Sequence, residues 1–417
     1  MIKKNYFITL IVASLFLVTC SKNDNPTGPN YDYKGQSTGT FDATFTEQTI
    51  YFDLTEIDDI ISIDTVNQIY KFKKTSVKAN EIAKDKILLI HGTALRKVTE
   101  VTNSGNEIIV ETDDATLDEA IKDGTIEWTT YCDFNPETQL QIEIGKKVYQ
   151  PTFQSGNKVS FSINLGDGYE YAITMELNKT SANVKMSVTK KINSAVKATF
   201  AADGTISSFS SFNKIQYANS KLVNYTNDNK NLKGDLTLSA TVAGSGNASI
   251  NKEIPFVIIS IPYTVGPIPV FIRIKLQLVI NVVVPIDGSA QASINFKYDS
   301  ETGLTYNGLN VEPKMRIGNY TITKNKSEVG ASSAIAVNYG IGFPRLELGI
   351  FDKVIVPWVQ TAFLISNDYT FYPACKQTRA SYIAGCGYNF EFLGIKSSAT
   401  KNLWQRDTTI DKTGNCP

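Results

Sequence analysis

Hydrophobic and polar residues alternate with a period of two along most of the chain beyond residue 36. Phe41, Ala43 and Phe45 begin the pattern, with a polar residue on either side of Ala43. This period places successive side chains on opposite faces of an extended strand. Turn residues interrupt the alternation, and further strands are predicted at 61–65, 69–73, 87–90, 95–101, 107–112 and 125–131. We therefore expect residues 37–133 to form a small β-rich domain.

One short helix is expected inside this domain. Thr116 and Glu119 are spaced as in a capping box, in which each side chain binds the backbone N–H of the other residue. Ala120 and Ile121 continue the helical pattern, and Gly124 is expected to end it.

The pattern beyond residue 133 is more purely that of strands. They are predicted at 159–165, 169–177, 182–192, 195–202, 232–250, 334–339, 345–354, 359–366 and 388–392. No repeat of fixed period links these segments. The sequence thus predicts an all-β protein with two β domains, the second a larger β-sandwich or curved sheet over residues 134–417.

Residues 254–272 carry no formal charge over the length that a membrane-spanning helix needs. Four prolines argue against a helix, because proline lacks the backbone N–H donor that a helix requires. From residue 270 to 284 every second residue is apolar, which predicts a strand of about 50 Å at ~3.3 Å per residue. Membrane-spanning strands share this alternation, but such proteins need many similar segments. We expect a strand of a soluble sheet with one buried face.

The amino terminus has the pattern of an export signal. Lys3 and Lys4 precede an apolar run over residues 6–18 that is too short to span a membrane. The run ends at residues 17–20 (LVTC), which resemble a lipobox, the signal for lipidation of a cysteine. Thr19 stands where a glycine, alanine or serine is usual.

This region resembles that of surface lipoproteins of Bacteroidota-type Gram-negative bacteria. The resemblance implies that residues 1–19 are removed as a signal peptide and that Cys20 is lipidated. Residues 20–36 then form a flexible tether, and the protein is an outer membrane lipoprotein exposed at the cell surface. The membrane is the partner of the anchor. An ordinary secretory signal with an incidental cysteine is the alternative.

The composition limits the classes of function. Among 417 residues, Lys and Arg number 41 and Asp and Glu number 41, so the formal net charge is zero. This balance argues against a broad basic surface, and therefore against nucleic acid as a partner. Loss of residues 1–19 removes two lysines and leaves a charge of −2. The single histidine argues against histidine-rich metal sites, and we expect neither a metal nor another cofactor.

Four cysteines remain beyond Cys20, an even number in a chain that is expected to be exported. They are Cys132, Cys375, Cys386 and Cys416. Disulfides form in oxidising compartments, and four cysteines allow three pairings. Cys375 with Cys386 would staple one loop, and Cys132 with Cys416 would tie the carboxyl terminus to the first half. Four buried thiols are the alternative, and the spacings do not suit a zinc site.

One pair of motifs imitates an α/β hydrolase. His91 and Gly92 end an apolar strand, and Ser37 lies between two glycines at the spacing of a nucleophile elbow. However, Ser37 adjoins the tether, the order of the two motifs is reversed, and no second histidine completes a triad. We expect His91 to end a strand and assign no catalytic residue.

A pair of carboxylates hydrolyses glycosides without histidine. Acidic residues cluster near the expected helix at Glu111, Asp113, Asp114, Asp118 and Glu119. No spacing selects two of them, and their density fits a solvated turn and a capped helix. The tryptophans, Trp128, Trp358 and Trp404, offer stacking faces for sugars, but core packing is the expected role of most aromatic residues.

Two regions resemble parts of large secreted bacterial surface proteins. Residues 95–101 (LRKVTEV), 109–112 (IVET) and 115–120 (ATLDEA) resemble a small module of these proteins. Residues 263–270 (YTVGPIPV), the strand after them and 303–308 (GLTYNG) resemble a β domain downstream of it. That family has no established activity, so the resemblance implies an exported β-rich surface protein and transfers no functional residue.

We therefore expect a lipid-anchored cell-surface protein with a non-enzymatic binding, adhesion or envelope-structural role. Its ligand would be a glycan, a polymer or a partner protein. A histidine-independent carbohydrate-active enzyme with paired carboxylates is one alternative. A carrier of lipid or another hydrophobic ligand, with an apolar tunnel beside residues 270–284, is the other.

Overall fold

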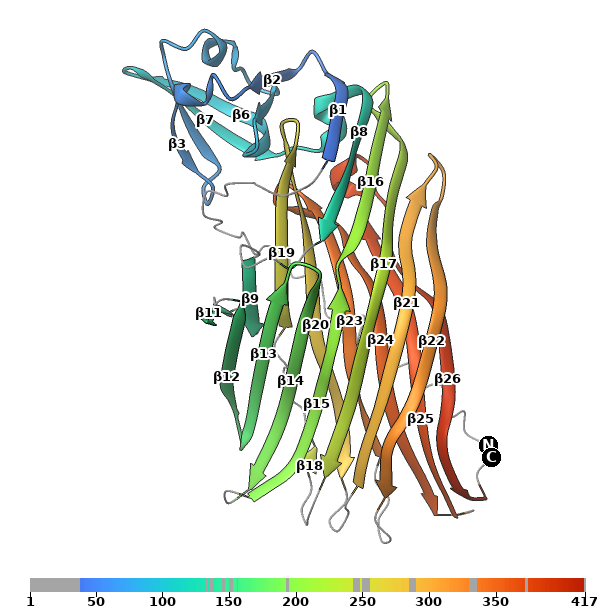
Figure 1. The fold of residues 1–417 in the computed structure, drawn as a ribbon. Coiled ribbons are helices and arrows are strands. Elements are labelled where there is room, and N and C mark those ends of the chain that lie inside the picture. Colours follow the sequence, from blue (N-terminus) through green and yellow to red (C-terminus); the bar gives the residue numbers. More distant parts are fainter. Residues whose placement is uncertain are drawn as a thin grey trace.

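The computed structural model describes residues 38–132, 134, 139–144, 147–149, 153–155, 157–192, 195–242, 248–249, 256–284, 290–329, 336–371 and 374–415. The predicted signal peptide, the tether and Cys20 lie outside the described residues. Strands dominate the described part of the chain and form large sheets (Figure 1). The predicted all-β fold is confirmed.

The front sheet is the larger layer of a sandwich. Its antiparallel strands follow the order β1-β8-β16-β17-β15-β14-β13-β12-β11, and β17 also pairs with β21, which pairs with β22. The strands are β1 (Thr38–Phe45), β8 (Ile121–Cys132), β11 (Phe153–Ser155), β12 (Lys158–Gly166), β13 (Tyr169–Asn178), β14 (Ser181–Ile192), β15 (Ala195–Ser207), β16 (Phe209–Ala218), β17 (Lys221–Val242), β21 (Ala290–Tyr306) and β22 (Val311–Val329).

The back sheet lies behind the front sheet in Figure 1 and is also antiparallel. Its order is β10-β9-β19-β20-β23-β24-β25-β26, with β18 beside β20. The strands are β9 (Gln139–Ile144), β10 (Lys147–Tyr149), β18 (Ala248–Ser249), β19 (Phe256–Val265), β20 (Ile268–Val284), β23 (Ala336–Ile350), β24 (Lys353–Phe371), β25 (Ala374–Asn389) and β26 (Ser398–Gly414). A short 3₁₀ helix, η3 (Glu391–Leu393), follows β25.

The small sheet forms a separate unit at one end of the sandwich. Its order is β2-β5-β6-β7-β4-β3, with β2 and β5 parallel and the other neighbours antiparallel. The strands are β2 (Thr49–Phe52), β3 (Ile60–Asp64), β4 (Ile69–Lys73), β5 (Ile87–Ile90), β6 (Ala94–Ser104) and β7 (Glu107–Asp114). Two 3₁₀ helices, η1 (Ile57–Asp59) and η2 (Lys78–Glu81), and the helix α2 (Leu117–Ala120) complete it.

The main core fills the space between the front and back sheets. Phe296 of the front sheet lies 5.1 Å from Phe363 of the back sheet, measured between ring centroids. The long strand expected over residues 270–284 is confirmed as β20, and Ile272, Ile274 and Leu276 on its inner face are at most 1% exposed. Burial of these apolar side chains is the main favourable contribution to the sandwich.

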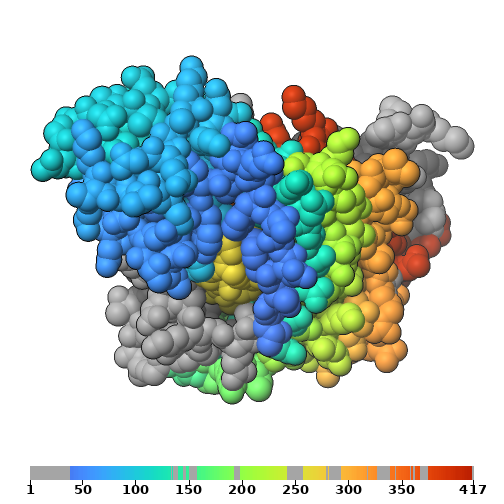
Figure 2. Space-filling model, turned by 90° about the horizontal axis from the view of Figure 1, so that it is seen from above, coloured from blue at the N-terminus to red at the C-terminus, as the bar shows by residue number. Residues whose placement is uncertain are grey.

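Strand β5 joins the small unit to this core. Ile87 and Leu89 point into the main core, whereas Leu88 and Ile90 point into a second core within the small unit. A strand that is buried on both faces needs a continuous apolar run, which is what residues 87–90 supply. Seen from above, the small unit covers one side of the end of the sandwich (Figure 2).

An ion-pair network also fixes the small unit to the sandwich. Arg96 of β6, whose side chain is 10% exposed, pairs with Asp114 of β7 and lies 3.5 Å from Asp352 of the β23–β24 turn. Lys353 reaches Asp114 at 2.7 Å across the same junction. The backbone N–H of Gly92 donates a hydrogen bond to the carbonyl of Pro267 at 2.8 Å.

The predicted helix is present but shorter than expected. Thr116 and Glu119 form the capping box, and the Thr116 N–H donates to the Glu119 carboxylate at 3.0 Å. Gly124 does not end this helix, because β8 already begins at Ile121. Gly124 instead lies opposite Ala43 of β1 with φ of 135°, and a Cβ there would stand 2.3 Å from the Asp42 carbonyl oxygen. Its lack of a side chain allows β1 to approach β8.

Both ends of the described segment 38–132 contribute strands to the sandwich. Strand β1 pairs with β8, and β8 pairs with β16 of the large sheet. The small sheet itself spans residues 49–114. Among the described residues no helix has the length and apolar character needed to cross a membrane.

Candidate functional site: a polar ladder inside the sandwich

A ladder of polar side chains crosses the inner face of the front sheet. One row places four residues opposite one another on β8, β16, β17 and β21: Thr130, Ser211, Asn229 and Thr302. Asn213 and Asn227 are opposite each other in the next inward-facing row. All six are at most 4% exposed. Buried polar groups need hydrogen-bond partners, so this ladder constrains the strands that carry it.

The amides of the ladder bind one another. Asn227 donates to the side-chain oxygen of Asn213 at 2.7 Å, and Asn229 donates to that of Asn227 at 2.9 Å. Asn213 also donates to the Ser211 hydroxyl at 3.2 Å. Of these three bonds, only the one from Asn227 to Asn213 joins β17 to β16, because each of the other two links residues of one strand. A slip of two residues would break this cross-strand bond, so the ladder favours the observed register of β16 and β17.

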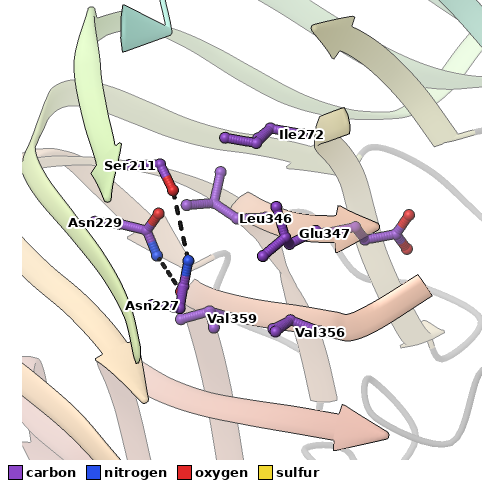
Figure 3. A pocket seen from close by; sticks show the side chains of 9 residues that line it. Ser211, Asn227, Asn229, Ile272, Leu346, Glu347, Val356 and Val359 are labelled. Atoms are coloured by element: carbon purple, nitrogen blue, oxygen red, sulfur yellow. Dashed lines mark hydrogen bonds between the residues drawn. The ribbon is translucent and has the colours of Figure 1, made fainter. Parts of the chain in front are cut away.

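The ladder borders a small cavity between the two sheets (Figure 3). Ser211, Asn227 and Asn229 form its polar wall, and aliphatic side chains of the back sheet form the other. Those aliphatic residues are Ile272, Leu346, Leu348, Val356 and Val359. The cavity measures about 10 Å³, which is room for about one water molecule. It is too small for a sugar, a nucleotide or an acyl chain.

Several phenol groups are buried around the ladder. The hydroxyl of Tyr225 has no hydrogen-bond partner within the part of the chain that the structure describes. Burial raises the pKa of Tyr225 and of Tyr263 well above the usual value for a phenol. These groups stay neutral near pH 7, so neither acts as a base there. The ladder and its surroundings are suited to structural hydrogen bonding rather than to acid–base chemistry.

Sequence reasoning did not find this ladder. Its signal is present in β16, where Phe209, Ser211, Asn213, Ile215 and Tyr217 share one face of the strand. Two polar residues in the middle of an otherwise apolar alternation indicate a buried polar pair or an exposed strand. The choice depends on the polar partners that β17 supplies across the turn, 14 residues further along the chain in the case of Asn213 and Asn227.

The cysteines do not pair as expected. Cys375 and Cys386 both lie on β25, where eleven residues of extended chain separate them by about 36 Å. A disulfide joins Cα atoms no more than ~7 Å apart, so the pairing of Cys375 with Cys386 was wrong. Cys386 and Cys132 are buried thiols, which also rules out Cys132 with Cys416. Cys375 is disulfide-bonded, and Cys416 lies outside the described residues.

His91 follows β5, as predicted from the sequence. Its Nδ1 lies 2.6 Å from the Tyr51 hydroxyl, and its backbone N–H donates to the Phe52 carbonyl at 3.0 Å. Burial lowers the pKa of His91 below the usual value. Ser37 lies outside the described residues. The surroundings of His91 thus give it a packing role at the junction of β2 and β5.

Two of the acidic residues near α2 form ion pairs. Asp114 binds Arg96 and Lys353, and Glu119 binds Lys97 at 3.0 Å besides capping α2. Glu111 and Asp113 are exposed on β7. Within the described ranges, no three or more His, Cys, Asp or Glu side chains gather as metal ligands would.

The tryptophans pack inside the protein rather than forming a platform. Trp128 is 1% exposed and Trp358 is 3% exposed. Trp404 is partly buried and meets the ring of Tyr382 edge-on, with centroids 4.6 Å apart. These three side chains therefore contribute packing area, and burial leaves no face of Trp128 or Trp358 free for a sugar.

Comparison with known proteins gives no match: no family model, no curated protein and no solved structure is significantly similar to this chain. The resemblance to bacterial surface proteins therefore remains a prediction from the sequence.

The ladder predicts a large stability cost for the loss of one amide. Asn227→Ala leaves the side-chain oxygen of Asn213 and the amide of Asn229 without these partners in a buried place. We expect the free energy of unfolding to fall by about 2–3 kcal/mol. Urea denaturation measures this. The control is Asn183→Ala on the exposed side of β14, which should change stability by no more than about 0.5 kcal/mol. Equal effects would contradict the constraint that we assign to the ladder.

The buried phenols predict loss of stability in alkali. Burial raises the pKa of Tyr382 to about 12 and raises the pKa of Tyr217, Tyr225 and Tyr298 from the ordinary value of 10.0. Unfolding lets these phenols ionise near pH 10, so their contribution is complete below about pH 10 and is lost as the pH rises further. Phenolate absorbance and the circular dichroism of the strands should change together. Ionisation of these phenols near pH 10 in a chain that keeps its strands would contradict the prediction.

Proposed function

We propose that this chain is a lipid-anchored cell-surface protein with a non-enzymatic binding, adhesion or envelope-structural role. One observation carries the proposal: among the described residues, side chains fill the space between the two sheets. Phe363, for example, stacks on Tyr382 at 4.7 Å and contacts Tyr298 at 5.0 Å, measured between ring centroids. With the interior occupied in this way, a ligand has to bind on an outer surface of the sandwich or of the small unit.

The amino-terminal sequence supports the anchor. Positive residues, a short apolar run and a cysteine in a lipobox-like context precede a polar segment. A lipid on Cys20 would hold the folded part at a membrane without a spanning segment, and residues 20–36 would serve as its tether. Such an arrangement places the outer surfaces of the protein where extracellular glycans, polymers and proteins are accessible.

The described carboxylates favour this role over glycoside hydrolysis. A hydrolase needs two carboxyl groups that face each other across a cleft, at a separation of about 5 to 9 Å. Of the acidic residues singled out in the sequence, Asp114 and Glu119 instead pair with cations, and Glu111 and Asp113 lie exposed on β7.

The packing beside β20 favours surface binding over lipid carriage. The inner face of this strand meets the polar ladder and aliphatic side chains, and the cavity at Ile272 holds about one water molecule. An acyl chain needs a continuous apolar space of many times that volume. The described part of β20 therefore borders a packed core.

The anchor is tested by replacing its cysteine. In a Gram-negative host of the Bacteroidota type, Cys20→Ala should move the protein from the membrane fraction to the soluble fraction, because it lacks the lipid acceptor. The neighbouring change Ser21→Ala keeps the acceptor and should leave the protein in the membrane fraction. Fatty-acid labelling should follow the same pattern, and protease added to intact cells should digest the wild type. Membrane retention of the Cys20→Ala variant would refute the anchor.

A further inference from the structure

Strand β3 is the outer strand of the small sheet. It pairs with β4 on one side and ends the order β2-β5-β6-β7-β4-β3. Figure 1 shows it at the margin of the small unit, on the side away from β1 and β8. Four of its five residues, from Ile61 to Asp64, are exposed. The backbone N–H and C=O groups along the outer edge of such a strand are available to another extended chain.

The exposed side chains of this edge are unusually apolar. Ile61 is 44% exposed and Ile63 is 37% exposed, and Leu54 and Val66 lie exposed on either side of the strand in the sequence. Ile60 packs on the second core of the small unit, so the edge continues a hydrophobic surface. Lysine and proline commonly protect edge strands, and β3 has neither. Its pairing with β4 shifts register between Ile60 and Ser62, so Ile61 has no partner residue on β4.

The same edge is strongly acidic. No lysine or arginine occurs between Lys34 and Lys71. The acidic residues around β3 are Asp53, Glu56, Asp58, Asp59 and Asp64. Glu56 is paired with Lys78, and on the neighbouring strand Lys71 is paired with Glu107 at 3.5 Å. Hydrogen bonds from the Thr55 side chain and from the Asn67 backbone lower the pKa of Asp53 and Asp64, respectively, so both stay ionised.

We propose that the β3 edge captures an extended segment of a partner protein, in which aliphatic residues alternate and lysine or arginine flanks them. This rests on the proposed surface-binding function and names its partner class and its site. The segment would add a strand to the small sheet, with main-chain hydrogen bonds for affinity and its aliphatic side chains against Ile61 and Ile63. Its basic ends would lie near Asp58, Asp59 and Asp64, at the two ends of β3.

A second copy of this chain fits the edge less well. Antiparallel pairing of two β3 strands would bring Asp64 of one copy near Asp58 and Asp59 of the other. Like charges placed opposite each other destabilise a strand pair. The acidic flanks therefore select a basic partner and oppose self-association.

The test uses the chain without its signal peptide and with Cys20→Ala, so that it stays in solution. The probe is a fluorescent peptide of alternating valine and threonine with two lysines at each end. We expect it to bind, and the double variant Ile61→Lys and Ile63→Lys to bind at least about tenfold more weakly, because edge lysines block pairing and repel the probe. The matched control is Val77→Lys, at another exposed aliphatic residue of the small unit, which should bind like the parent chain.

Two further peptides test the chemistry of the interaction. A peptide with glutamates in place of the lysines should bind more weakly, and raised salt should reduce the difference. A peptide of the same composition with its valines made consecutive should also bind more weakly, since alternation sets which side chains face the sheet. Thermal unfolding of each variant confirms that the fold is intact.

The proposal is overturned if the probe binds the double variant and the parent chain equally, if it binds neither, or if the chain dimerises through β3. These outcomes leave the surface-binding function standing when a glycan array or a pull-down with the same protein still finds a ligand that the double variant retains. Loss of every ligand in those assays would instead count against the proposed function.

Discussion

Strand β17 determines how the halves of the front sheet fit together. Along one edge its first half pairs with β16 and its second half with β15, while its other edge pairs with β21. A single strand of 22 residues thus joins β1, β8 and β16 to the group of strands from β15 to β11 in one sheet. Because both groups depend on it, correct pairing of β17 is a condition for closing the core.

The polar ladder makes that pairing specific. Long strands with regular apolar alternation tolerate a slip of two residues without exposing their core face. The bond from Asn227 of β17 to Asn213 of β16 forms in the observed register and is lost when the two strands slip. The ladder thus gives the sandwich a defined register, while the packed aromatic and aliphatic side chains give it stability.

Elements that are determined by residues close together in the sequence were predictable from it. The alternation of β20, the apolar run of β5 and the capping box of α2 each contain the information that determines them. The polar strands β16, β21 and β22 were missed, because their inward or paired faces include Ser, Asn and Thr whose partners are distant. The Cys375–Cys386 pairing failed for a similar reason: sequence distance suggested a loop, but both residues lie on one extended strand. For the candidate site, the sequence shows the Ser, Asn and Thr residues but not which of them lie side by side. Their contacts depend on the register between strands.

The central claim is that the interior is closed and that ligands bind outside. Native mass spectrometry of the Cys20→Ala protein, purified from cells without detergent, tests it most directly. The account predicts the mass of the polypeptide alone, with no fatty acid or phospholipid retained. A stoichiometric lipid that survives purification and dissociates only when the chain unfolds would contradict it, because such a ligand requires an apolar space between the sheets.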